Sequence, residues 1–311
     1  MHDAQQVFAV LLVYQLDPSV VATNLESLGA TVRALVVVDN SSSRDAARWN
    51  ILAAGNRKVH AVMNGANAGV AAGWNAGIKL ALEQGAEFVL LLDEDSIPGT
   101  EMVQGLITAW AVLARTNALA AVGPDFRDRT TGARAIFVSM SRYGIRRRCC
   151  SAEDKFLPTD YLMSSGSLVH RTVFDAVGFM DERLFIDYVD TEWCLRARSR
   201  GRACFGVCGA HMQHAFGSRP LPVPWGRGRA VPDRDPSRSY YIYRNALLLL
   251  ACAHCPLIWK VNELRRLVLL MGLYLIRSPR RWQHLRMALR GMVDALRGRT
   301  GPLPVNEAVW V

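Results

Sequence analysis

The sequence predicts an α/β fold in which a mostly parallel central sheet is flanked by helices and followed by a C-terminal helical section. Over the first 125 residues, short apolar runs alternate with amphipathic stretches, a pattern typical of βαβ units. The apolar runs are nearly continuous, which fits strands covered on both faces. Half of the 311 residues are apolar and 21% are charged, so the composition excludes a disordered chain.

The length and spacing of these runs place the individual elements. Strands are predicted at residues 7–13, 34–38, 59–63, 88–92 and 119–122. Helices, which have apolar residues three and four apart, are predicted at 18–28, 44–54, 71–83 and 100–113. Beyond these, a strand-like run at 161–169 is interrupted by Ser and Gly, helices are expected at 172–177 and 191–200, and a strand at 203–207.

The positive charge belongs to the C-terminal half. Residues 141–311 contain 27 Lys and Arg against 14 Asp and Glu. Residues 219–239, rich in Pro, Gly and Arg, are predicted to form a mobile basic loop. Residues 240–311 are predicted to be helical, but their apolar stretches are shorter than the ~20 residues that span a bilayer. They fit either an interfacial surface on anionic lipid or a helical subdomain with a solvated arginine face.

The cysteines and the N-terminus bear on the compartment. Seven cysteines, an odd number without framework spacing, predict reduced thiols rather than disulfides. Cys252 and Cys255 are expected to be buried small apolar residues. The first residues carry no cationic segment and no small-residue cleavage site, so no signal peptide is predicted, and a cytoplasmic location is expected.

Polar residues follow successive strands, where open α/β sheets bind ligands. Asp93 and Asp95 come after the strand at 88–92, and strand alternation points them to the same side. Two carboxylates at a strand end can share Mg²⁺ or Mn²⁺, whose remaining ligands are typically phosphate oxygens and water. The alternative is that they only cap a helix or loop.

Glycines recur every four residues from Gly65 to Gly77. This spacing differs from G-x-G-x-x-G, so it argues against a dinucleotide fingerprint and favours close packing of the following helix. The turn at 67–69 can also bring backbone N–H groups near an anion.

A further acidic cluster contains Asp187, Asp190 and Glu192. Asp190 fits the N-cap position of the following helix, or a general base that takes a proton from an acceptor hydroxyl. Beyond the next predicted strand, His211 and His214 are candidates for a metal ligand or a phosphate contact.

The order of these motifs resembles the inverting family 2 glycosyltransferases of GT-A fold. Within them it is similar to the dTDP-rhamnosyltransferases of O-antigen and cell-wall synthesis and to the second rhamnosyltransferase of rhamnolipid synthesis. The motifs that carry the resemblance lie at residues 38–42, 67–77, 91–96, 164–167, 180–193 and 214–219. The resemblance implies a GT-A catalytic domain over 1–218, with a nucleotide-binding half at 1–125 and an acceptor half at 126–218.

The resemblance also implies nucleotide contacts. Asp39 and the loop after Val13 would contact the thymine and ribose of the donor, and Asn67 and Gly69 would line the nucleotide pocket.

A metal role and a diphosphate role follow in the same way. Asp95 would ligate Mg²⁺ or Mn²⁺, with Asp93 nearer the ribose. His214 and Arg219 match the region that closes over the diphosphate, and His214 is a further candidate metal ligand.

Asp190 matches the aspartate of the family's Glu-Asp pair and is the candidate catalytic base. The glutamate of that pair is replaced by Val189, which leaves Glu192 and Asp187 as substitute candidates.

The implied reaction moves L-rhamnose from dTDP-β-L-rhamnose to a lipid-borne sugar, with inversion. The acceptor would be a rhamnolipid or a lipid-linked glycan at the inner face of the cytoplasmic membrane. The alternatives are another nucleotide-sugar donor, or an inactive membrane-associated binding protein on the same scaffold. Nucleic-acid binding is not expected, since the basic residues form no known nucleic-acid motif.

Overall fold

The central sheet has the strand order β3–β2–β1–β4–β10–β6–β11–β5, with β9 paired to β11. The computed structural model describes residues 6–14, 18–28, 31–41, 58–129, 131–215, 220–222 and 230–303. The strands of the sheet are β1 (Val7–Val13), β2 (Ala34–Asp39), β3 (Val59–Met63), β4 (Phe88–Asp93), β5 (Ser96–Pro98), β6 (Leu119–Asp128), β9 (Phe156–Thr159), β10 (Leu168–His170) and β11 (Ala203–His214).

Parallel pairing dominates the N-terminal half of the sheet. β3, β2, β1 and β4 are parallel neighbours, and β6 is parallel to β11. β10, β5 and β9 pair antiparallel with their neighbours. The predicted fold and its N-terminal strands are thus confirmed, and every residue of β1 is buried, as expected for a sheet covered on both faces.

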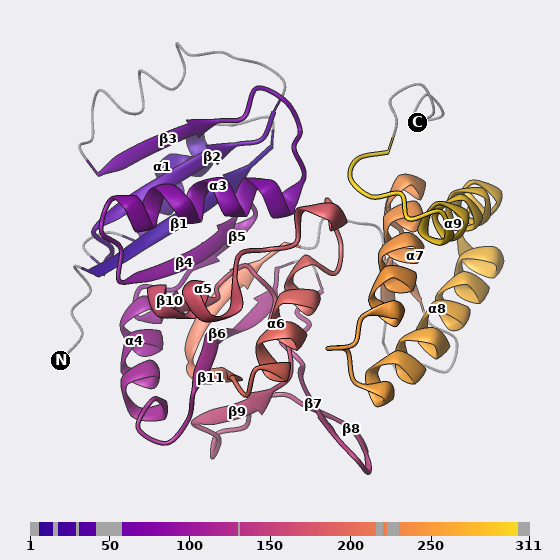
Figure 1. The fold of residues 1–311 in the computed structure, drawn as a ribbon. Coiled ribbons are helices and arrows are strands. Elements are labelled where there is room, and N and C mark those ends of the chain that lie inside the picture. Colours follow the sequence, from indigo (N-terminus) through magenta and orange to yellow (C-terminus); the bar gives the residue numbers. More distant parts are fainter. Residues whose placement is uncertain are drawn as a thin grey trace.

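Helices cover the sheet and extend beyond it (Figure 1). They are α1 (Pro18–Leu28), α3 (Val70–Glu83), α4 (Met102–Leu113), α5 (Arg171–Val177), α6 (Val189–Ser199), α7 (Pro236–Ala251), α8 (Leu257–Arg277) and α9 (Arg281–Leu296), with a 3₁₀ turn at Glu182–Leu184. A hairpin of β7 (Phe137–Ser141) and β8 (Gly144–Arg148) lies outside the main sheet. The helix predicted at 44–54 lies outside the described residues.

The glycine repeat brings α3 close to the sheet. A Cβ on Gly77 would lie 2.3 Å from Val10 Cγ1, and one on Gly73 would lie 2.5 Å from Leu12 Cδ1. α3 therefore packs nearer to β1 than it could if Gly73 or Gly77 carried a Cβ atom, which confirms the predicted close packing.

Two strand predictions were wrong in extent. Only residues 168 and 169 of the run predicted at 161–169 lie in a strand, β10, because Ser167 N–H bonds to the Ser164 carbonyl and Gly166 has a φ of 86°. In the other direction, β11 does not end at 207 but continues to His214, where it pairs with Ser96 of β5. Both differences bring polar side chains to the carboxyl end of β4.

The expectation of wholly reduced thiols was also wrong. Cys150 and Cys208 form a disulfide across 58 residues of sequence. The fold places Cys208 of β11 beside the segment before β9, where its N–H donates to the Lys155 carbonyl. Because this proximity is tertiary, cysteine spacing could not reveal it. Cys255 is buried, as predicted, and Cys252 is half-buried.

The C-terminal section consists of α7, α8 and α9, standing beside the sheet and facing α6 in Figure 1. None of its described helices is long and apolar enough to cross a membrane. Within the loop predicted at 219–239, β12 (Pro220–Pro222) pairs with β13 (Ala230–Pro232), and α7 begins at Pro236. The mobility of that loop stays a prediction.

Candidate active site

A cleft of about 700 Å³ opens at the carboxyl ends of β1, β2 and β4. The strand register accounts for its position, since Val13 of β1 pairs with Asp39, and Leu12 pairs with Asp93. The predicted site residues that line the cleft are Val13, Asn67, Gly69, Asp93, Asp95, Asp187, Asp190 and His214. Asp39 and Glu192 lie off its wall, and Arg219 lies outside the described residues.

Asn40, which the sequence interpretation did not select, organises the nucleotide side of the cleft. Its Nδ2 donates to the Gly69 carbonyl (3.0 Å), and its Oδ1 accepts from Ala68 N–H (3.1 Å) and Asn64 Nδ2 (3.1 Å). Asn40 is buried, and it follows directly after β2. Its place at a strand end was the signal that could have found it.

The loop 67–71 does not direct its N–H groups toward a ligand as expected. Gly69 N–H donates to its neighbour Asn67 Oδ1 (3.1 Å), and Val70 N–H donates to the Phe185 carbonyl (2.6 Å). Gly69 has a φ of 90°, and a Cβ there would lie 2.7 Å from that carbonyl. Backbone geometry therefore requires a glycine at this position, which also lines the cleft.

Asp39 is buried at the end of β2 beside the cleft. Its Oδ1 accepts from Ser41 N–H (2.9 Å) and Ser41 Oγ (2.6 Å). The carboxylate thus fixes the turn after β2, and its predicted contact with the nucleotide stays a prediction.

Asp93, Asp95 and His214 form a group that could hold a metal ion, with one ligand atom from each lying within 4.8 Å of the others. Asp95 Oδ1 lies 3.1 Å from His214 Nδ1. The same Oδ1 is buried and has no hydrogen-bond partner among the described residues. Two carboxylates and an imidazole suit Mn²⁺, and carboxylates suit Mg²⁺, so the donor set fits the predicted cation.

Electrostatics in this group also favour a cation. Burial and then the charges of Asp95, Asp190 and Glu94 raise the pKa of Asp93 to about 7. Burial raises the pKa of Asp95 to about 6, while burial lowers the pKa of His214 to about 4. The imidazole is therefore a neutral nitrogen donor at neutral pH, and a bound cation would relieve the repulsion between the two carboxylates.

A hydrogen-bonded chain joins this group to the turn before β10. Asp93 N–H donates to Ser165 Oγ (2.9 Å), Ser165 Oγ lies 2.6 Å from Ser96 Oγ, and Ser96 Oγ lies 2.8 Å from His214 Nδ1. The turn at Ser164–Ser167 and the extension of β11 meet in this chain. It fixes the imidazole beside Asp95.

A strained loop forms the opposite wall of the cleft. Phe185, Asp187 and Tyr188 each have a φ of 64°, a conformation that non-glycine residues rarely adopt. Asn245 of α7, which is fully buried, donates to the carbonyls of Leu184 (2.9 Å), Ile186 (2.8 Å) and Asp187 (3.0 Å). The C-terminal helices thereby hold this loop in place.

Asp190 follows the strained loop and lies in the first turn of α6. The N-cap is Tyr188, so the predicted N-cap position of Asp190 was wrong. Its Oδ1 accepts from Thr191 N–H (2.7 Å), and burial raises the pKa of the carboxyl. A raised pKa makes the carboxylate a stronger proton acceptor.

The substitute candidates for the base are held in ion pairs. Asp187 accepts from Arg238 Nε and Nη2 (both 2.8 Å) and from Arg234 (3.1 Å). Glu192 is buried on α6 and accepts from Arg196 Nε (2.8 Å) and Nη2 (2.9 Å). Neither arginine partner of Asp187 was visible as a site residue in the sequence, because each lies about fifty positions away.

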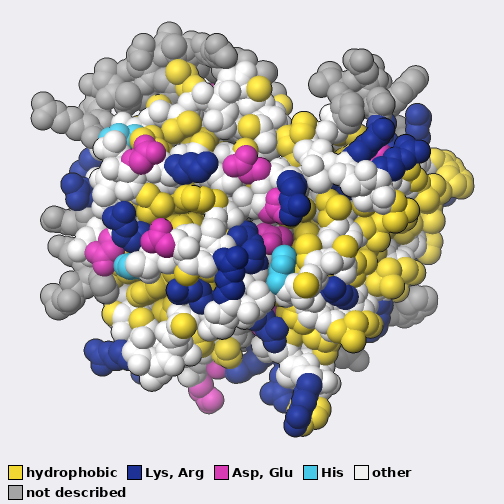
Figure 2. All heavy atoms as spheres, viewed as in Figure 1, with side chains coloured by type: hydrophobic (Ala, Val, Ile, Leu, Met, Phe, Trp, Pro, Cys, Tyr) yellow, Lys and Arg dark blue, Asp and Glu magenta, His cyan; other side chains and the backbone are white. Residues whose placement is uncertain are grey.

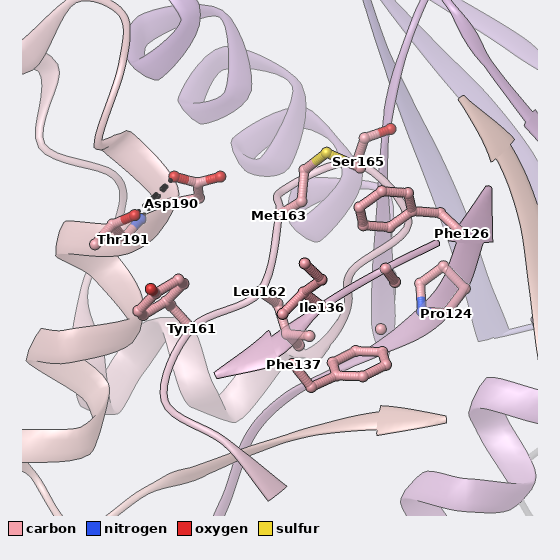
Figure 3. A pocket seen from close by; sticks show the side chains of 12 residues that line it. Pro124, Phe126, Ile136, Phe137, Tyr161, Leu162, Met163, Ser165, Asp190 and Thr191 are labelled. Atoms are coloured by element: carbon pink, nitrogen blue, oxygen red, sulfur yellow. Dashed lines mark hydrogen bonds between the residues drawn. The ribbon is translucent and has the colours of Figure 1, made fainter. Parts of the chain in front are cut away.

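A second pocket of about 230 Å³ lies on the other side of Asp190. Figure 3 shows the Asp190 carboxylate at one end and apolar side chains, among them Phe126, Ile136 and Leu162, at the other. Asp190 and Met163 line both this pocket and the large cleft. The carboxylate therefore stands between two separate binding spaces.

A mostly parallel sheet with an acidic group that could hold a cation at its strand ends, facing a half-buried carboxylate that lines two pockets, is typical of a glycosyltransferase of GT-A fold. Residues 12–177 match the family model described as "Glycosyl transferase family 2", and the chain belongs to that family. It is 34% identical over 245 residues to dTDP-rhamnosyl transferase RfbF of Shigella flexneri, covering 78% of this chain and 80% of that protein. Galactofuranosyltransferase GlfT1 of Mycobacterium tuberculosis is 30% identical over 250 residues, covering 78% and 81%.

Solved structures share the fold. The crystal structure of GalNAc-T7 with UDP, GalNAc and Mn²⁺ superimposes with a TM-score of 0.57 at 12% identity. That likeness covers 84% of this chain and 54% of the GalNAc-T7 chain, so this chain spans about half of that protein.

Proposed function

We propose that this glycosyltransferase moves L-rhamnose from dTDP-β-L-rhamnose to a hydroxyl of a lipid-borne sugar, with inversion. The observation that carries the proposal is the position of Asp190, which lines the cleft of the acidic cation group and also the second pocket. The large cleft suits the donor, and the second pocket suits the acceptor. The similarity to dTDP-rhamnosyl transferase RfbF supports the choice of donor.

In the proposed mechanism Asp190 removes the proton of the acceptor hydroxyl as its oxygen attacks the anomeric carbon. The new C–O bond forms on one face of the sugar while the bond to the diphosphate breaks on the other. dTDP leaves with the electron pair, and the product is an α-L-rhamnoside. The burial that raises the pKa of Asp190 favours this proton transfer.

The departing diphosphate gathers negative charge, which the cleft must stabilise. Asp93, Asp95 and His214 would hold Mg²⁺ or Mn²⁺, and the cation would offset that charge. Arg238, which also lines the cleft, contributes a fixed positive charge near Asp93. Arg219 is proposed to close over the diphosphate.

The lipid-borne acceptor, a rhamnolipid or a lipid-linked glycan, and action at the inner face of the cytoplasmic membrane are part of this proposal. The basic, apolar C-terminal helices support it. A second candidate is transfer of a different sugar, since one similar protein is a galactofuranosyltransferase.

The test is turnover of a donor panel by the purified protein with Mn²⁺ or Mg²⁺ and lipid-linked acceptors. We expect dTDP release from dTDP-L-rhamnose and little release of nucleotide from UDP-glucose, UDP-galactofuranose or GDP-mannose. Selective use of another donor would replace the rhamnose assignment. If no donor were consumed under any condition, the chain would be better described as a binding protein on this scaffold.

A further inference from the structure

The outer surface of α8 and α9 carries an unusual density of exposed apolar side chains. On α8, Leu257, Val261, Leu264 and Val268 recur at helical spacing and are 53–75% exposed. On α9 the exposed apolar residues are Trp282, Leu289, Val293 and Leu296. Figure 2 shows the resulting apolar surface on the side of the molecule where α8 and α9 lie.

The charges beside this apolar surface have one sign. Exposed arginines accompany both helices, at Arg265, Arg277, Arg281, Arg286 and Arg297. The acidic residues between positions 257 and 297 are Glu263 and Asp294. Both are buried, and they pair with Arg266 and Arg299 respectively. The outer face of this helical pair is therefore apolar and cationic.

We propose that the outer face of α8 and α9 docks in the plane of an anionic phospholipid bilayer. The apolar stripe would enter the boundary between headgroups and acyl chains, and the arginines would contact lipid phosphates. Charge complementarity selects this occupant. A symmetric contact between two copies of the chain would instead bring arginines of like charge together around the same patch.

Docking in this orientation brings the lipid surface close to the base. The inner face of α8, through Trp259, Glu263 and Arg266, lines a pocket of about 470 Å³ that also includes Tyr161 and Thr191. Tyr161 and Thr191 line the smaller pocket of Asp190 as well. One helix, about 10 Å across, therefore separates the proposed membrane surface from the space beside Asp190. This step rests on the proposed function of Asp190.

The docking itself is tested by co-sedimentation with phosphatidylcholine vesicles, with and without phosphatidylglycerol. We expect at least about tenfold stronger binding to the anionic vesicles, weakened by added salt. Leu264→Asp combined with Val268→Asp should lose most of this binding. The control is Val112→Asp, which changes an exposed apolar residue of α4 (47% exposed) and should bind like the wild type.

Trp282 can report how deeply α9 enters the bilayer, since this residue is 71% exposed. Fluorescence quenching by brominated lipid should be reduced in Trp282→Phe. Circular dichroism and thermal unfolding show whether each variant is folded. Vesicle binding needs neither donor nor acceptor, so its failure is distinguishable from failure of the proposed reaction.

Three results would overturn the proposal. They are equal binding to neutral and anionic vesicles, wild-type binding by the folded Leu264→Asp/Val268→Asp variant, and a wild-type dimer in analytical ultracentrifugation that this variant converts to monomer. The last result would assign the surface to a second copy of the chain.

Discussion

The side-chain amide of Asn245 donates a hydrogen bond to the backbone carbonyl of Asp187, 3.0 Å away and 58 residues distant in sequence. Through this contact α7 reaches the loop that precedes the proposed base. Phe185 extends the link, since its carbonyl accepts from Val70 N–H at the start of α3 and its ring stacks on Tyr241 of α7. The C-terminal helices therefore help to hold one wall of the proposed active site.

Asn245→Ala should impair catalysis through the loop at 184–187, although the Asn245 side chain is not expected to contact substrate. The substitution leaves buried carbonyls without a donor, which costs about 1–3 kcal/mol of folding free energy, and it frees a strained loop. We expect kcat to fall about 10- to 100-fold, because a small misplacement of a catalytic group costs a factor of that order. The KM for donor should change less. Steady-state kinetics well below the melting temperature test this.

The control is Asn117→Ala, since Asn117 is a half-buried residue that bonds to the Leu113 carbonyl at the end of α4. It should change neither parameter. An Asn245→Ala enzyme with wild-type kcat would show that α7 supports stability alone.

Local patterns predicted the parallel sheet well. Apolar runs mark β1, β2 and β4 because both faces of these strands are buried, and polar residues after them mark the cleft. The antiparallel additions were harder, since β5 and β10 are three residues long and owe their strand conformation to neighbours that are distant in sequence.

The predictability of the site divides in the same way. Asp93, Asp95 and Asp190 stand in local motifs, so the sequence located them. Arg238 and Asn245 act from α7 on a loop about fifty to sixty residues earlier, and no spacing rule connects such positions. The disulfide of Cys150 and Cys208 was missed for the same reason.

Gly77→Ala should destabilise the fold. Alanine favours a helix by about 1 kcal/mol over glycine, but its Cβ would lie 2.3 Å from Val10 Cγ1 and 2.7 Å from Val38 Cγ2. Overpacking a core of this kind costs about 1–3 kcal/mol, so the net effect is a lower melting temperature. Gly272→Ala in α8 is the matched control, because a Cβ there meets nothing within 4 Å, and it should raise the melting temperature slightly.

His214→Ala should weaken Mn²⁺ binding by more than about tenfold, since even outer partners of a metal site contribute about that much. Isothermal titration calorimetry or Mn²⁺ electron paramagnetic resonance measures the affinity. His211→Ala is the control, because His211 lies on the same strand but is exposed and is not part of the Asp93–Asp95–His214 group. Equal affinity in the two variants would remove His214 from the metal site.

Mn²⁺ affinity should also depend on pH near neutrality. The pKa of Asp93 is about 7 and that of Asp95 about 6, so below these values a cation must displace protons. We expect affinity to fall about tenfold per pH unit for each proton displaced. Folding stability of the metal-free protein should change with pH in the opposite direction, because both pKa values are raised on folding from 3.8. The contribution of these carboxyls is fully present below about pH 4 and is lost as the pH rises from there through about 6 to 7. Thermal unfolding in EDTA checks this, and Asp95→Asn should flatten the profile.

Substitutions should distinguish the roles of the three acidic residues near the start of α6. Asp190→Asn should lower kcat by about 10²- to 10⁴-fold, the range of a general base, while dTDP binding stays near the wild-type level. Glu192→Gln should mainly lower the melting temperature, since it breaks the buried pair with Arg196. Asp187→Asn should have an intermediate effect, because it loosens Arg238 and Arg234 at the cleft. Single-turnover release of dTDP, with donor binding measured separately, distinguishes these cases. Full turnover by Asp190→Asn, or its loss in a stably folded Glu192→Gln, would move the base to another carboxylate.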